Sequence, residues 1–240
     1  MCGRFVSAAD LDAVSAYFDT PLPGFDAPRS YNVAPTTDIV AVVGNDDARR
    51  IETFRWGLVP PWSKDPTKGP LLFNSRSETA ATKNSFRGAF KRRRCLVPAD
   101  GFYEWPRAPK GTPRDDRPLP HYITRVDGGM LAMAGLWERW SPPDDPADGA
   151  PPNVLHSATV LTTAANGFMA SIHDRMPVLL ERPQWEAWLD PANDDVDELA
   201  AMCLPAAEGI LRSHQVSREV GSVRNRDASL IDPVEPDRLF

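Results

Sequence analysis

The sequence predicts an α+β fold built on a large, mostly antiparallel sheet. Strand and helix patterns mix along the 240 residues without the strict strand–helix alternation of a parallel sheet. Two proline-rich stretches, 106–120 and 141–155, are flanked by strand patterns that resume on their far sides, so we expect surface loop insertions. No internal repeat is visible, and we expect one domain over 1–240 with a C-terminal tail from about residue 226.

The first part of the chain predicts a helix, a hairpin and a second helical region. Ser7 is placed to cap a helix with Asp10 as its partner. The apolar face of this helix comprises Leu11, Val14, Tyr17 and Phe18. Residues 38–44 and 50–59 are rich in strand-forming side chains and are joined by the turn-like GNDDA, which predicts a β-hairpin. The stretch 77–94 predicts one or two helices, followed by strands around CLVP and GFYEW.

The second half of the chain continues this mixed pattern. Strands are predicted at HYITRV, MLAMAGLWERW, SATVLTT and PVLL, with a short helical segment between the last two. Helices are predicted at RPQWEAWL and DVDELAAMCL. The stretch LRSHQVS predicts a last strand before an irregular tail.

The composition is that of an ordinary globular protein, with 42% hydrophobic and 25% charged residues. No stretch approaches the roughly 18 consecutive apolar residues of a membrane span, and the N-terminus does not resemble a secretory signal. Cys2, Cys95 and Cys203 are odd in number and far apart, which argues against a disulfide framework and favours a reducing cytoplasm. With four histidines and no C-x-x-C motif, we expect no metal site.

The charge is unevenly distributed along the chain. The net charge is −6, but residues 54–125 contain fifteen Lys or Arg against six Asp or Glu, a local balance of +9. Much of the acidic excess lies in 141–152 and 190–199. A basic middle in an acidic chain is compatible with a polyanionic partner at one face. The alternative for the run FRGAFKRRRC is a solvated helix face with cations favoured at its C-terminal end.

Cys2 stands where removal of the initiator methionine makes it the N-terminal residue. Buried structural cysteines are rare at chain ends, because termini fray unless something holds them. A free α-amine and a thiol on one residue titrate near about 8 and about 8.5, so both nucleophiles are partly available at neutral pH. This pair suits amide hydrolysis or the capture of an aldehyde.

Three further stretches of the sequence contain polar residues in unusual surroundings. Glu104 lies in the strand pattern GFYEW, where aromatic neighbours would raise its pKa towards that of a general acid or base; the alternative is a solvent-facing edge residue. His173 stands at a loop-to-strand junction and is either a proton shuttle or a structural histidine. In FNSRSET, Asn74 and Arg76 are either functional or, respectively, a helix cap and an ion-pair partner of Glu78.

Seven stretches extend in order from Cys2 to about Asn225, namely MCGRF, YNVAPT, RWGLVPPWSK, NSRSETA, RRCLVPADGFYEW, IHDRMPVLL and SHQVSREVGSVRN. Together they resemble the SRAP family, proteins first called SOS-response-associated peptidases and now described as abasic-site processing proteins. The resemblance implies a single SRAP-type domain on a barrel-like antiparallel sheet with flanking helices. It also implies a DNA-damage response protein that senses abasic sites in single-stranded DNA and shields them through a covalent cross-link.

The resemblance implies chemical roles for four residues. After removal of Met1, the α-amine of Cys2 adds to the ring-opened aldehyde to give an imine, and the thiol then closes a thiazolidine. Glu104 resembles the family's catalytic glutamate, which transfers protons, and His173 resembles the histidine that helps open the deoxyribose. Asn74 resembles the asparagine that positions the Cys2 end and the sugar. Cleavage of the strand as a lyase and self-processing of Met1 are associated expectations.

The resemblance also implies six DNA-binding residues, namely Arg4, Arg76, Trp56, Trp105, Thr162 and Arg175. The first two would hold phosphates, a role that suits forked and permanently charged guanidinium groups. The tryptophans and Arg175 are expected to form walls or strand contacts, because aromatic side chains stack on any base. Thr162 is a candidate from its spacing to IHDR.

We expect no cofactor, no metal and no membrane partner. The expected partner is single-stranded DNA containing abasic sites, including sites at junctions with duplex DNA. A monomer in the cytoplasm, associated with the nucleoid when bound to DNA, would suffice. Two alternatives stay open: a thiol peptidase acting on other proteins through Cys2 and His173, and a non-catalytic single-strand binding module.

Overall fold

The computed structural model describes residues 2–44, 48–142 and 154–234. Its strands are β1 (Phe5–Ser7), β2 (Ser30–Val33), β3 (Asp38–Gly44), β4 (Arg49–Trp56), β5 (Asn74–Arg76), β6 (Arg94–Ala99), β7 (Gly101–Glu104), β8 (His121–Arg125), β9 (Leu131–Trp140), β10 (Leu155–Ala164), β11 (Arg175–Pro177) and β12 (Leu211–Gln215). Its α-helices are α1 (Leu11–Phe18), α2 (Ser77–Ala80), α3 (Arg87–Arg92), α4 (Gly167–Ala170), α5 (Trp185–Leu189) and α6 (Val196–Ala201). Short 3₁₀ turns are η1 (Arg114–Asp116), η2 (Arg182–Gln184), η3 (Arg218–Gly221) and η4 (Ala228–Ile231).

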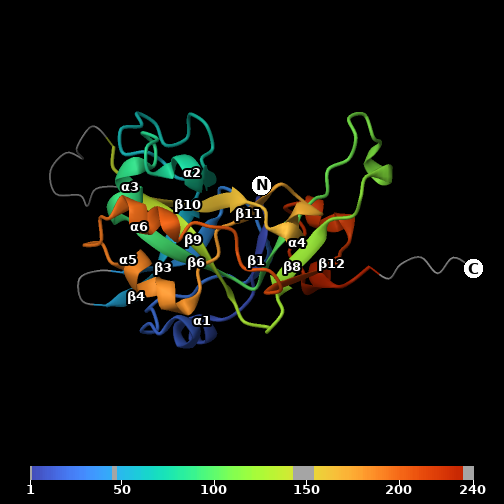
Figure 1. The fold of residues 1–240 in the computed structure, drawn as a ribbon, viewed down its shortest axis with the longest axis horizontal. Coiled ribbons are helices and arrows are strands. Elements are labelled where there is room, and N and C mark those ends of the chain that lie inside the picture. The colour runs from blue at the N-terminus through green and yellow to red at the C-terminus, as the bar shows by residue number, and fades with distance from the viewer. Residues whose placement is uncertain (1, 45–47, 143–153, 235–240) are drawn as a thin grey trace, which may run out of the picture.

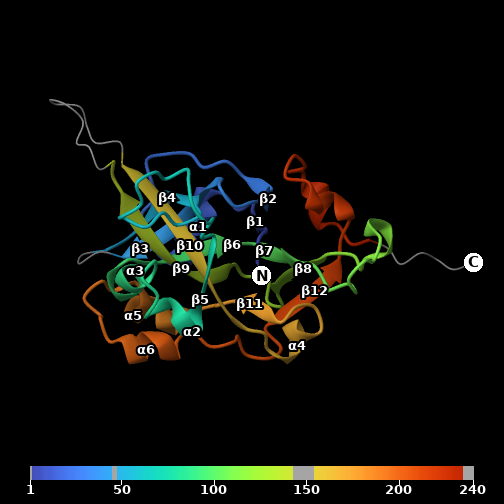
Figure 2. The same cartoon turned by 90° about the horizontal axis from the view of Figure 1, so that it is seen from above.

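Five strands close into a barrel in the order β10–β4–β3–β6–β9 (Figures 1 and 2). The ring closes because β9 pairs with β10 as well as with β6. All of these pairings are antiparallel except that of β10 with β4. The short strands β5 and β11 pair with the last residues of β10, where β10 continues beyond the ring. Closure removes the exposed edges that an open sheet of this size would present.

A second, open sheet has the strand order β12–β8–β7–β1–β2 and is antiparallel throughout. It lies beside the barrel, and β6 leads into β7 through a single residue, Asp100. The helices α1, α3, α5 and α6 lie around the barrel, away from the second sheet (Figure 1). The predicted α+β class with a mostly antiparallel sheet and flanking helices is therefore confirmed.

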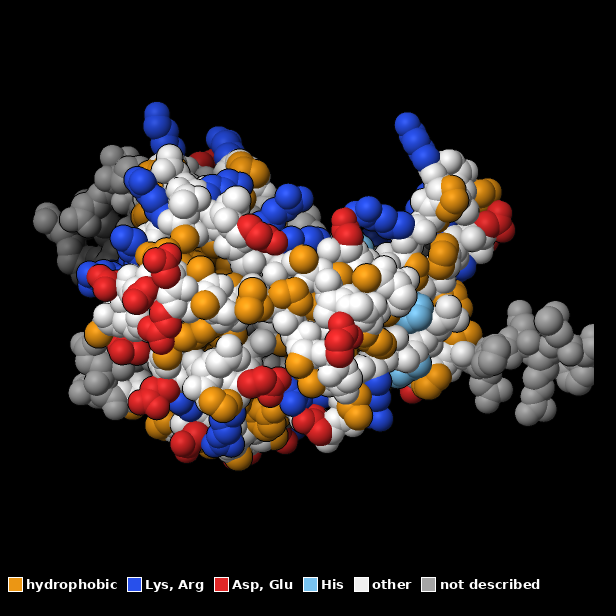
Figure 3. Space-filling view, in the orientation of Figure 1, with side chains coloured by type: hydrophobic (Ala, Val, Ile, Leu, Met, Phe, Trp, Pro, Cys, Tyr) orange, Lys and Arg blue, Asp and Glu red, His pale blue; other side chains and the backbone are white. Residues whose placement is uncertain are grey.

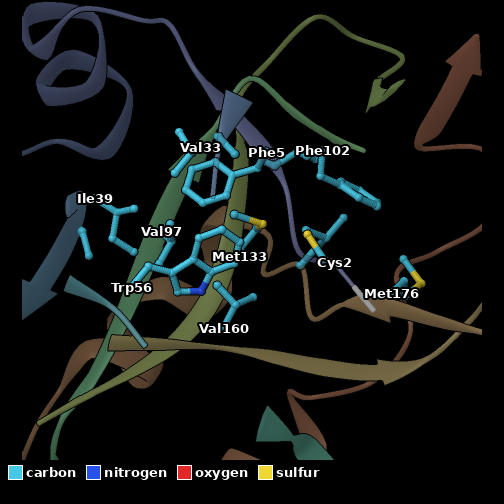
Figure 4. Packing of buried hydrophobic residues seen from close by; sticks show 14 of the residues in the cluster. Cys2, Phe5, Val33, Ile39, Trp56, Val97, Phe102, Met133, Val160 and Met176 are labelled. Atoms are coloured by element: carbon cyan, nitrogen blue, oxygen red, sulfur yellow. The ribbon is translucent and has the colours of Figure 1, made fainter. Parts of the chain in front are cut away.

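One hydrophobic cluster fills the barrel and reaches the second sheet (Figure 4). It contains Cys2 together with Phe5, Trp56, Phe102 and Met176, all of which are at most 1% exposed. Burial of this many large side chains is the main stabilising term for the fold, at about 25 cal/mol per Å² of apolar surface. A second cluster lies under the helices on the outside of the barrel.

The start of the first helix differs from the prediction. Asp10, not Ser7, is the N-cap of α1, and its carboxylate accepts a hydrogen bond from the backbone N–H of Ala13 at 2.8 Å. Ser7 instead ends β1, where it pairs with Ser30 of β2. Because Ser7 is part of this strand, it is not available to cap the helix.

The other elements follow the predicted order with shifted ends. The hairpin of β3 and β4 is confirmed, with Asp38 opposite Arg55, although residues 45–47 of its turn lie outside the described residues. The strand predicted at PVLL begins earlier, at Arg175, and ends at Pro177. Leu179 makes only an isolated bridge to Met133.

The two proline-rich insertions and the tail are described to different extents. The insertion at 106–120 projects from the end of β7, as Figure 1 shows, and Arg218 donates to the carbonyl oxygens of Asp115, Arg117 and Pro118 within it. Of the second insertion, 143–153 lies outside the described residues. The tail is less irregular than predicted, because Leu230 of η4 is 2% exposed and packs in a third hydrophobic cluster.

Candidate active site

The start of the chain is held against β7 by strand pairing. Phe5 lies opposite Phe102, and the backbone N–H of Tyr103 donates to the carbonyl oxygen of Arg4 at 2.9 Å. Because paired antiparallel strands run in opposite directions, the residues that precede Arg4 approach the end of β7 at Glu104. Cys2 is fully buried there, with its Sγ 3.9 Å from the carbonyl oxygen of Arg4. Figure 4 shows it at the edge of the cluster, on the side of Met176.

Asn74 fixes the backbone of Cys2 from the opposite side. Asn74 begins β5, which runs parallel to β10 with Val160 as its partner. Its Nδ2 donates a hydrogen bond of 2.7 Å to the carbonyl oxygen of Cys2. Its Oδ1 is buried and accepts no hydrogen bond from the described residues. A buried acceptor of this kind is costly unless a further donor reaches it, so it is available to a ligand hydroxyl or amine.

Glu104 is the last residue of β7 and is 2% exposed. Burial raises the pKa of its carboxyl to about 7, and the positive charge of the chain's amino terminus opposes this rise. A carboxyl with this pKa exchanges protons readily at neutral pH, which is what general acid–base catalysis requires. Burial and the charge of Glu104 together raise the pKa of the Cys2 thiol far above its ordinary range.

His173 lies in the turn between α4 and β11. The backbone N–H of Arg175 donates to its Nδ1 at 3.0 Å, which assigns the proton of the neutral ring to Nε2. An Asp174 carboxylate oxygen also lies 3.0 Å from Nδ1. Burial and the charge of the amino terminus lower the pKa of His173, while Asp174 raises it in part.

Two predicted phosphate contacts differ in their availability. Arg76 is exposed at the end of β5, two residues after Asn74, and its guanidinium has no hydrogen bond to any described residue. Arg4 is half-buried, and its Nη1 donates to Asn32 Oδ1 and to the carbonyl oxygen of Val220, both at 3.0 Å. Arg4 therefore ties β1 to β2 and η3 in addition to any role towards DNA.

Arg175 is engaged by neighbouring residues. Its guanidinium forms a two-pronged ion pair with Glu78, at 2.5 and 2.9 Å, and Nη2 also donates to the carbonyl oxygen of Thr162 at 2.6 Å. The sequence alternative that paired Arg76 with Glu78 is wrong, because Glu78 takes Arg175 instead. This pair joins α2 to β11 next to His173.

Trp56 and Thr162, two of the predicted DNA contacts, are core residues. Trp56 has no exposed surface, donates from Nε1 to the carbonyl oxygen of Phe73 at 2.8 Å and packs edge-on against Phe5. Thr162 is also fully buried, and its hydroxyl donates to the carbonyl oxygen of Ser75 at 3.4 Å. Neither side chain can touch a bound strand in this structure, because barrel packing covers both. Trp105 is half-buried beside a groove lined by the 106–120 insertion.

The run of arginines at 92–94 is divided among three environments. Arg92 is exposed at the end of α3, and Arg93 pairs with Glu138 at 2.6 Å. Arg94 is 2% exposed, and its guanidinium donates to carbonyl oxygens that include those of Trp188 and Phe90. Only part of this run can therefore form a solvated basic face.

Charges are segregated over the molecular surface (Figure 3). In that view most Lys and Arg side chains gather along the upper edge, from the region of α2 and α3 to the 106–120 insertion. Asp and Glu side chains gather over α5 and α6. The first described residues lie on the basic side, near β11 (Figures 1 and 2). The basic middle predicted from sequence thus forms an edge of the folded molecule.

Two features of the molecule are not evident from the local sequence. Trp62 is 59% exposed, unlike Trp56 six residues earlier, and no local sequence signal separates the two. Arg107 reaches across from the insertion to Asp174 at 2.6 Å, a contact between residues 67 positions apart. Long-range contacts of this kind depend on how the loops fold back and leave no periodic pattern.

Within the described part of the chain, no cluster of three or more His, Cys, Asp or Glu side chains has a metal-binding arrangement. Over the same residues, no helix has both the length and the apolar character that crossing a bilayer requires. Cys2, Cys95 and Cys203 are all buried free thiols.

Comparisons with known proteins agree with the motifs. The chain is 37% identical over 234 residues to the abasic site processing protein YoqW of Bacillus subtilis, covering 97% of this chain and 99% of that protein. It is 31% identical to the abasic site processing protein YedK of Escherichia coli, covering 98% and 100%. It is 33% identical to the abasic site processing protein HMCES of Gallus gallus, covering 78% of this chain and 58% of that protein.

Solved structures show the same fold. A crystal structure of a protein from Bacteroides thetaiotaomicron superposes with a TM-score of 0.80 at 22% identity, covering 98% of this chain and all of the other. One from Bordetella bronchiseptica gives 0.70 at 26% identity, covering 90% of this chain and all of the other. The sequence profile of the SOS response associated peptidases matches residues 1–223. The chain therefore belongs to the SOS response associated peptidase (SRAP) family.

Proposed function

We propose that this protein processes abasic sites in single-stranded DNA by forming a covalent cross-link through Cys2 once Met1 has been removed. The observation that carries the proposal is the setting of Cys2. The second residue of the chain is fully buried, and its carbonyl oxygen is held by Asn74 at 2.7 Å. Burial and the charge of the titratable Glu104 raise the pKa of the Cys2 thiol, and Asp174 beside His173 also acts on Glu104. The names of its relatives, abasic site processing proteins, support the same substrate.

The cross-link follows from the two nucleophiles of an N-terminal cysteine. The neutral α-amine of Cys2 adds to the aldehyde carbon of the ring-opened deoxyribose, and loss of one water gives an imine. The thiol sulfur then bonds to the imine carbon while the thiol proton moves to nitrogen, closing a five-membered thiazolidine. The net change is protein plus aldehyde minus water. No oxidant or reductant is needed.

Glu104 and His173 suit the proton transfers in this sequence. The carbinolamine must lose its hydroxyl as water, which needs an acid, and a carboxyl with a pKa of about 7 can supply that proton near neutrality. The same carboxylate can then accept the proton from the thiol as sulfur attacks. His173 with its proton on Nε2 can donate to the ring oxygen as the deoxyribose opens.

The surface around the site suits a polyanionic strand. Arg76 presents an exposed guanidinium two residues from Asn74, and the basic edge in Figure 3 continues from there. Farther from Cys2, beside Arg87 of α3, Trp62 offers an exposed indole on which a base can stack. We extend the proposal to a monomer that prefers single strands or their junctions with duplex, to 3′ strand cleavage from the imine stage and to self-removal of Met1.

The electrostatics of the thiol disfavour the alternative of a peptidase acting on other proteins. A cysteine peptidase attacks with a thiolate, and its surroundings lower the pKa of the thiol. Here burial and Glu104 raise the pKa of Cys2 instead. In the thiazolidine route the amine attacks first, so a neutral thiol is no obstacle.

Intact mass spectrometry after mixing with an oligonucleotide that has one abasic site tests the proposal. The expected species is the protein without Met1 plus the oligonucleotide minus one water, formed without borohydride. Cys203→Ala is the matched control, because it removes another buried thiol far along the chain and should cross-link normally. Normal cross-linking by Cys2→Ala would overturn the mechanism, and so would cleavage of unrelated peptides by protein that forms no adduct.

A further inference from the structure

Three charged or titratable side chains form a contact chain at the edge of the site. Arg107 Nη2 donates to Asp174 Oδ2 at 2.6 Å, and Asp174 Oδ1 lies 3.0 Å from His173 Nδ1. Arg107 belongs to the insertion after β7, whereas Asp174 and His173 belong to the turn before β11. The chain of contacts therefore connects the insertion that follows Glu104 to the turn that precedes β11.

His173 Nδ1 faces two partners with opposite requirements. The backbone N–H of Arg175, at 3.0 Å, needs an unprotonated nitrogen as its acceptor. The carboxylate of Asp174 needs a proton on the same nitrogen, because two lone pairs at 3.0 Å repel each other. A proton on Nδ1 satisfies Asp174 and gives up the bond from Arg175, and the negative charge of Asp174 then favours keeping the second proton on Nε2, which makes the ring an imidazolium. Arg107 favours the neutral ring by engaging the negative charge of Asp174.

The Arg107–Asp174 ion pair is exposed, so a bound phosphate can replace Asp174 as the partner of Arg107. The side chains are 71% and 55% exposed, and an ion pair at such exposure is weak because water screens it. A phosphate accepts the fork of an arginine at least as well as a carboxylate does. A strand lying along the basic edge would bring phosphates to this position, since the insertion borders that edge.

Several other groups also act on His173 and Glu104. The amino terminus and Arg107 lower the pKa of His173, and Asp174 raises it. The amino terminus also lowers the pKa of Glu104, which Asp174 raises. Arg175 contacts His173 through its backbone, but its guanidinium is occupied by Glu78. Asp174 is thus the group that raises the pKa of both candidate acids, and Arg107 engages its charge.

We propose that Arg107 and Asp174 form a phosphate-operated latch, in which a DNA phosphate takes Arg107 from Asp174 and the freed carboxylate then holds a proton on His173. Asp174 and Arg107 are positioning residues that act through His173. The inference rests on the proposed function, because in it the binding of the strand protonates His173, which then acts as the acid that opens the sugar. It would confine acid catalysis by His173 to the DNA-bound protein.

Titration of His173 in the free protein tests the latch without any cross-linking. The chain has four histidines, so Cε1-labelled histidine gives four signals, and His173→Ala identifies the one of interest. We expect Arg107→Ala to raise the pKa of His173 by roughly half a pH unit. Asp174→Asn should lower it, and Arg107→Ala should add little in the Asp174→Asn background. Equal pKa values in the four proteins would overturn the proposal. The signals of His156 and His214 should be the same in all of these proteins, which would show that the fold is intact.

Binding of unmodified single-stranded DNA, which has no aldehyde, tests the role of phosphate. In protein carrying Cys2→Ala, the DNA should raise the pKa of His173, and Asp174→Asn should remove most of this rise. Arg107→Lys should keep the response, because an ammonium can pair with either partner. A rise that is unchanged by Asp174→Asn would mean that phosphate acts on His173 directly, and would overturn the latch. Because no adduct forms, failure here leaves the proposed cross-link chemistry standing.

Discussion

At the scale of single residues, Asn74 is the group on which the position of Cys2 depends most directly. Asn74→Ala removes the donor of the 2.7 Å hydrogen bond and leaves the carbonyl oxygen of Cys2 in a buried setting. We expect cross-linking to slow by about tenfold to a hundredfold, because the loss of one such bond costs about 1–3 kcal/mol. Single-turnover rates with abasic oligonucleotide measure this.

A matched control and a second variant separate position from stability. Asn84→Ala changes an exposed asparagine and should leave the rate unchanged. Asn74→Asp keeps the size of the side chain but replaces the donor by a carboxylate, so it should be at least as slow as Asn74→Ala. A rate for Asn74→Asp equal to that of the unchanged protein would show that the hydrogen bond is not needed.

Glu104 gives a prediction about stability and pH. Its carboxyl titrates near about 4.3 when unfolded and at about 7 when folded, because burial disfavours the charge. Between these values the folded protein holds a proton that the unfolded chain releases, so its contribution to stability falls as pH rises through this window. Glu104→Gln cannot ionise. It should therefore match the unchanged protein at pH 4 and exceed it by on the order of 3 kcal/mol at pH 8.

Urea unfolding of both proteins at pH 4 and pH 8 checks this difference, since groups common to both cancel. The same variant should cross-link slowly at pH 7, because a neutral amide transfers no proton. A variant that is less stable at pH 8 would mean that the Glu104 carboxylate is favourably paired in the folded protein. Its pKa would then not be raised, and it would not hold a proton near neutral pH.

Residue identity in the site could be predicted from sequence more readily than residue accessibility. Cys2, Asn74, Glu104 and His173 stand in recognisable motifs, and the structure brings the start of the chain to Asn74 and Glu104. Trp56 stands in an equally recognisable motif but is fully buried. Phe54 and Trp56 stand on the face of β4 that points into the filled barrel, whereas Thr53 on the other face is exposed. The motif alone does not tell which face of the strand points inward.

At the scale of elements, the position of β7 depends on a glycine. A Cβ on Gly101 would lie 2.6 Å from the carbonyl oxygen of Ile123 and 2.5 Å from the ring of Tyr122, both in the neighbouring strand β8. Such contacts force the strands apart. We expect Gly101→Ala to destabilise the protein by at least about 2 kcal/mol and to slow cross-linking, because Glu104 ends the same strand.

Thermal unfolding and cross-linking rates of Gly101→Ala check this prediction. Gly24→Ala is the control, because nothing lies within 4 Å of the Cβ it would add. If Gly101→Ala loses stability but keeps its rate at low temperature, the placement of Glu104 does not depend on tight packing of β7 against β8.

The elements themselves were largely predictable, and their ends were not. The strand and helix patterns follow from side-chain periodicity, which is local. The cap of α1 moved from Ser7 to Asp10 because Ser7 pairs with Ser30, more than twenty residues away. The ring also needs the pairing of β10 with β4, in which Ser157 lies opposite Arg55 from a distant part of the chain. Pairings between distant strands leave no periodic signal, so barrel closure followed only from the family resemblance.

At the scale of the whole molecule, the fold separates the basic and acidic segments of the sequence onto different parts of the surface. Residues 54–125 carry a charge of +9, and the structure places much of this charge along one edge while the acidic 190–199 region lies over α5 and α6. An edge of this kind attracts a strand along its length and repels it elsewhere, so it orients the strand towards the site. The buried Arg94 and the paired Arg93 contribute little to this field, because their charges are engaged.

The basic edge predicts that affinity depends on both position and strand length. Arg76 lies at the site, whereas Arg87 lies on α3, towards the end of the edge. A strand of about six nucleotides should contact only the former, and one of about twenty should contact both. In Cys2→Ala protein, Arg76→Ala should weaken binding of both strands, and Arg87→Ala that of the longer one only. Each arginine that contacts one phosphate should reduce the slope of log affinity against log salt by about 0.7.

Arg182→Ala is the matched control, because it removes an arginine beside α5, on the side of the molecule away from the basic edge. Fluorescence anisotropy at several salt concentrations gives affinity and slope for each protein. If Arg182→Ala reduced the slope as much as Arg87→Ala, the strand would be held by net charge rather than by a track. An effect of Arg87→Ala confined to the longer strand would mean that bound DNA leaves the site across α3, on the far side of Cys2 from the Arg107–Asp174 latch.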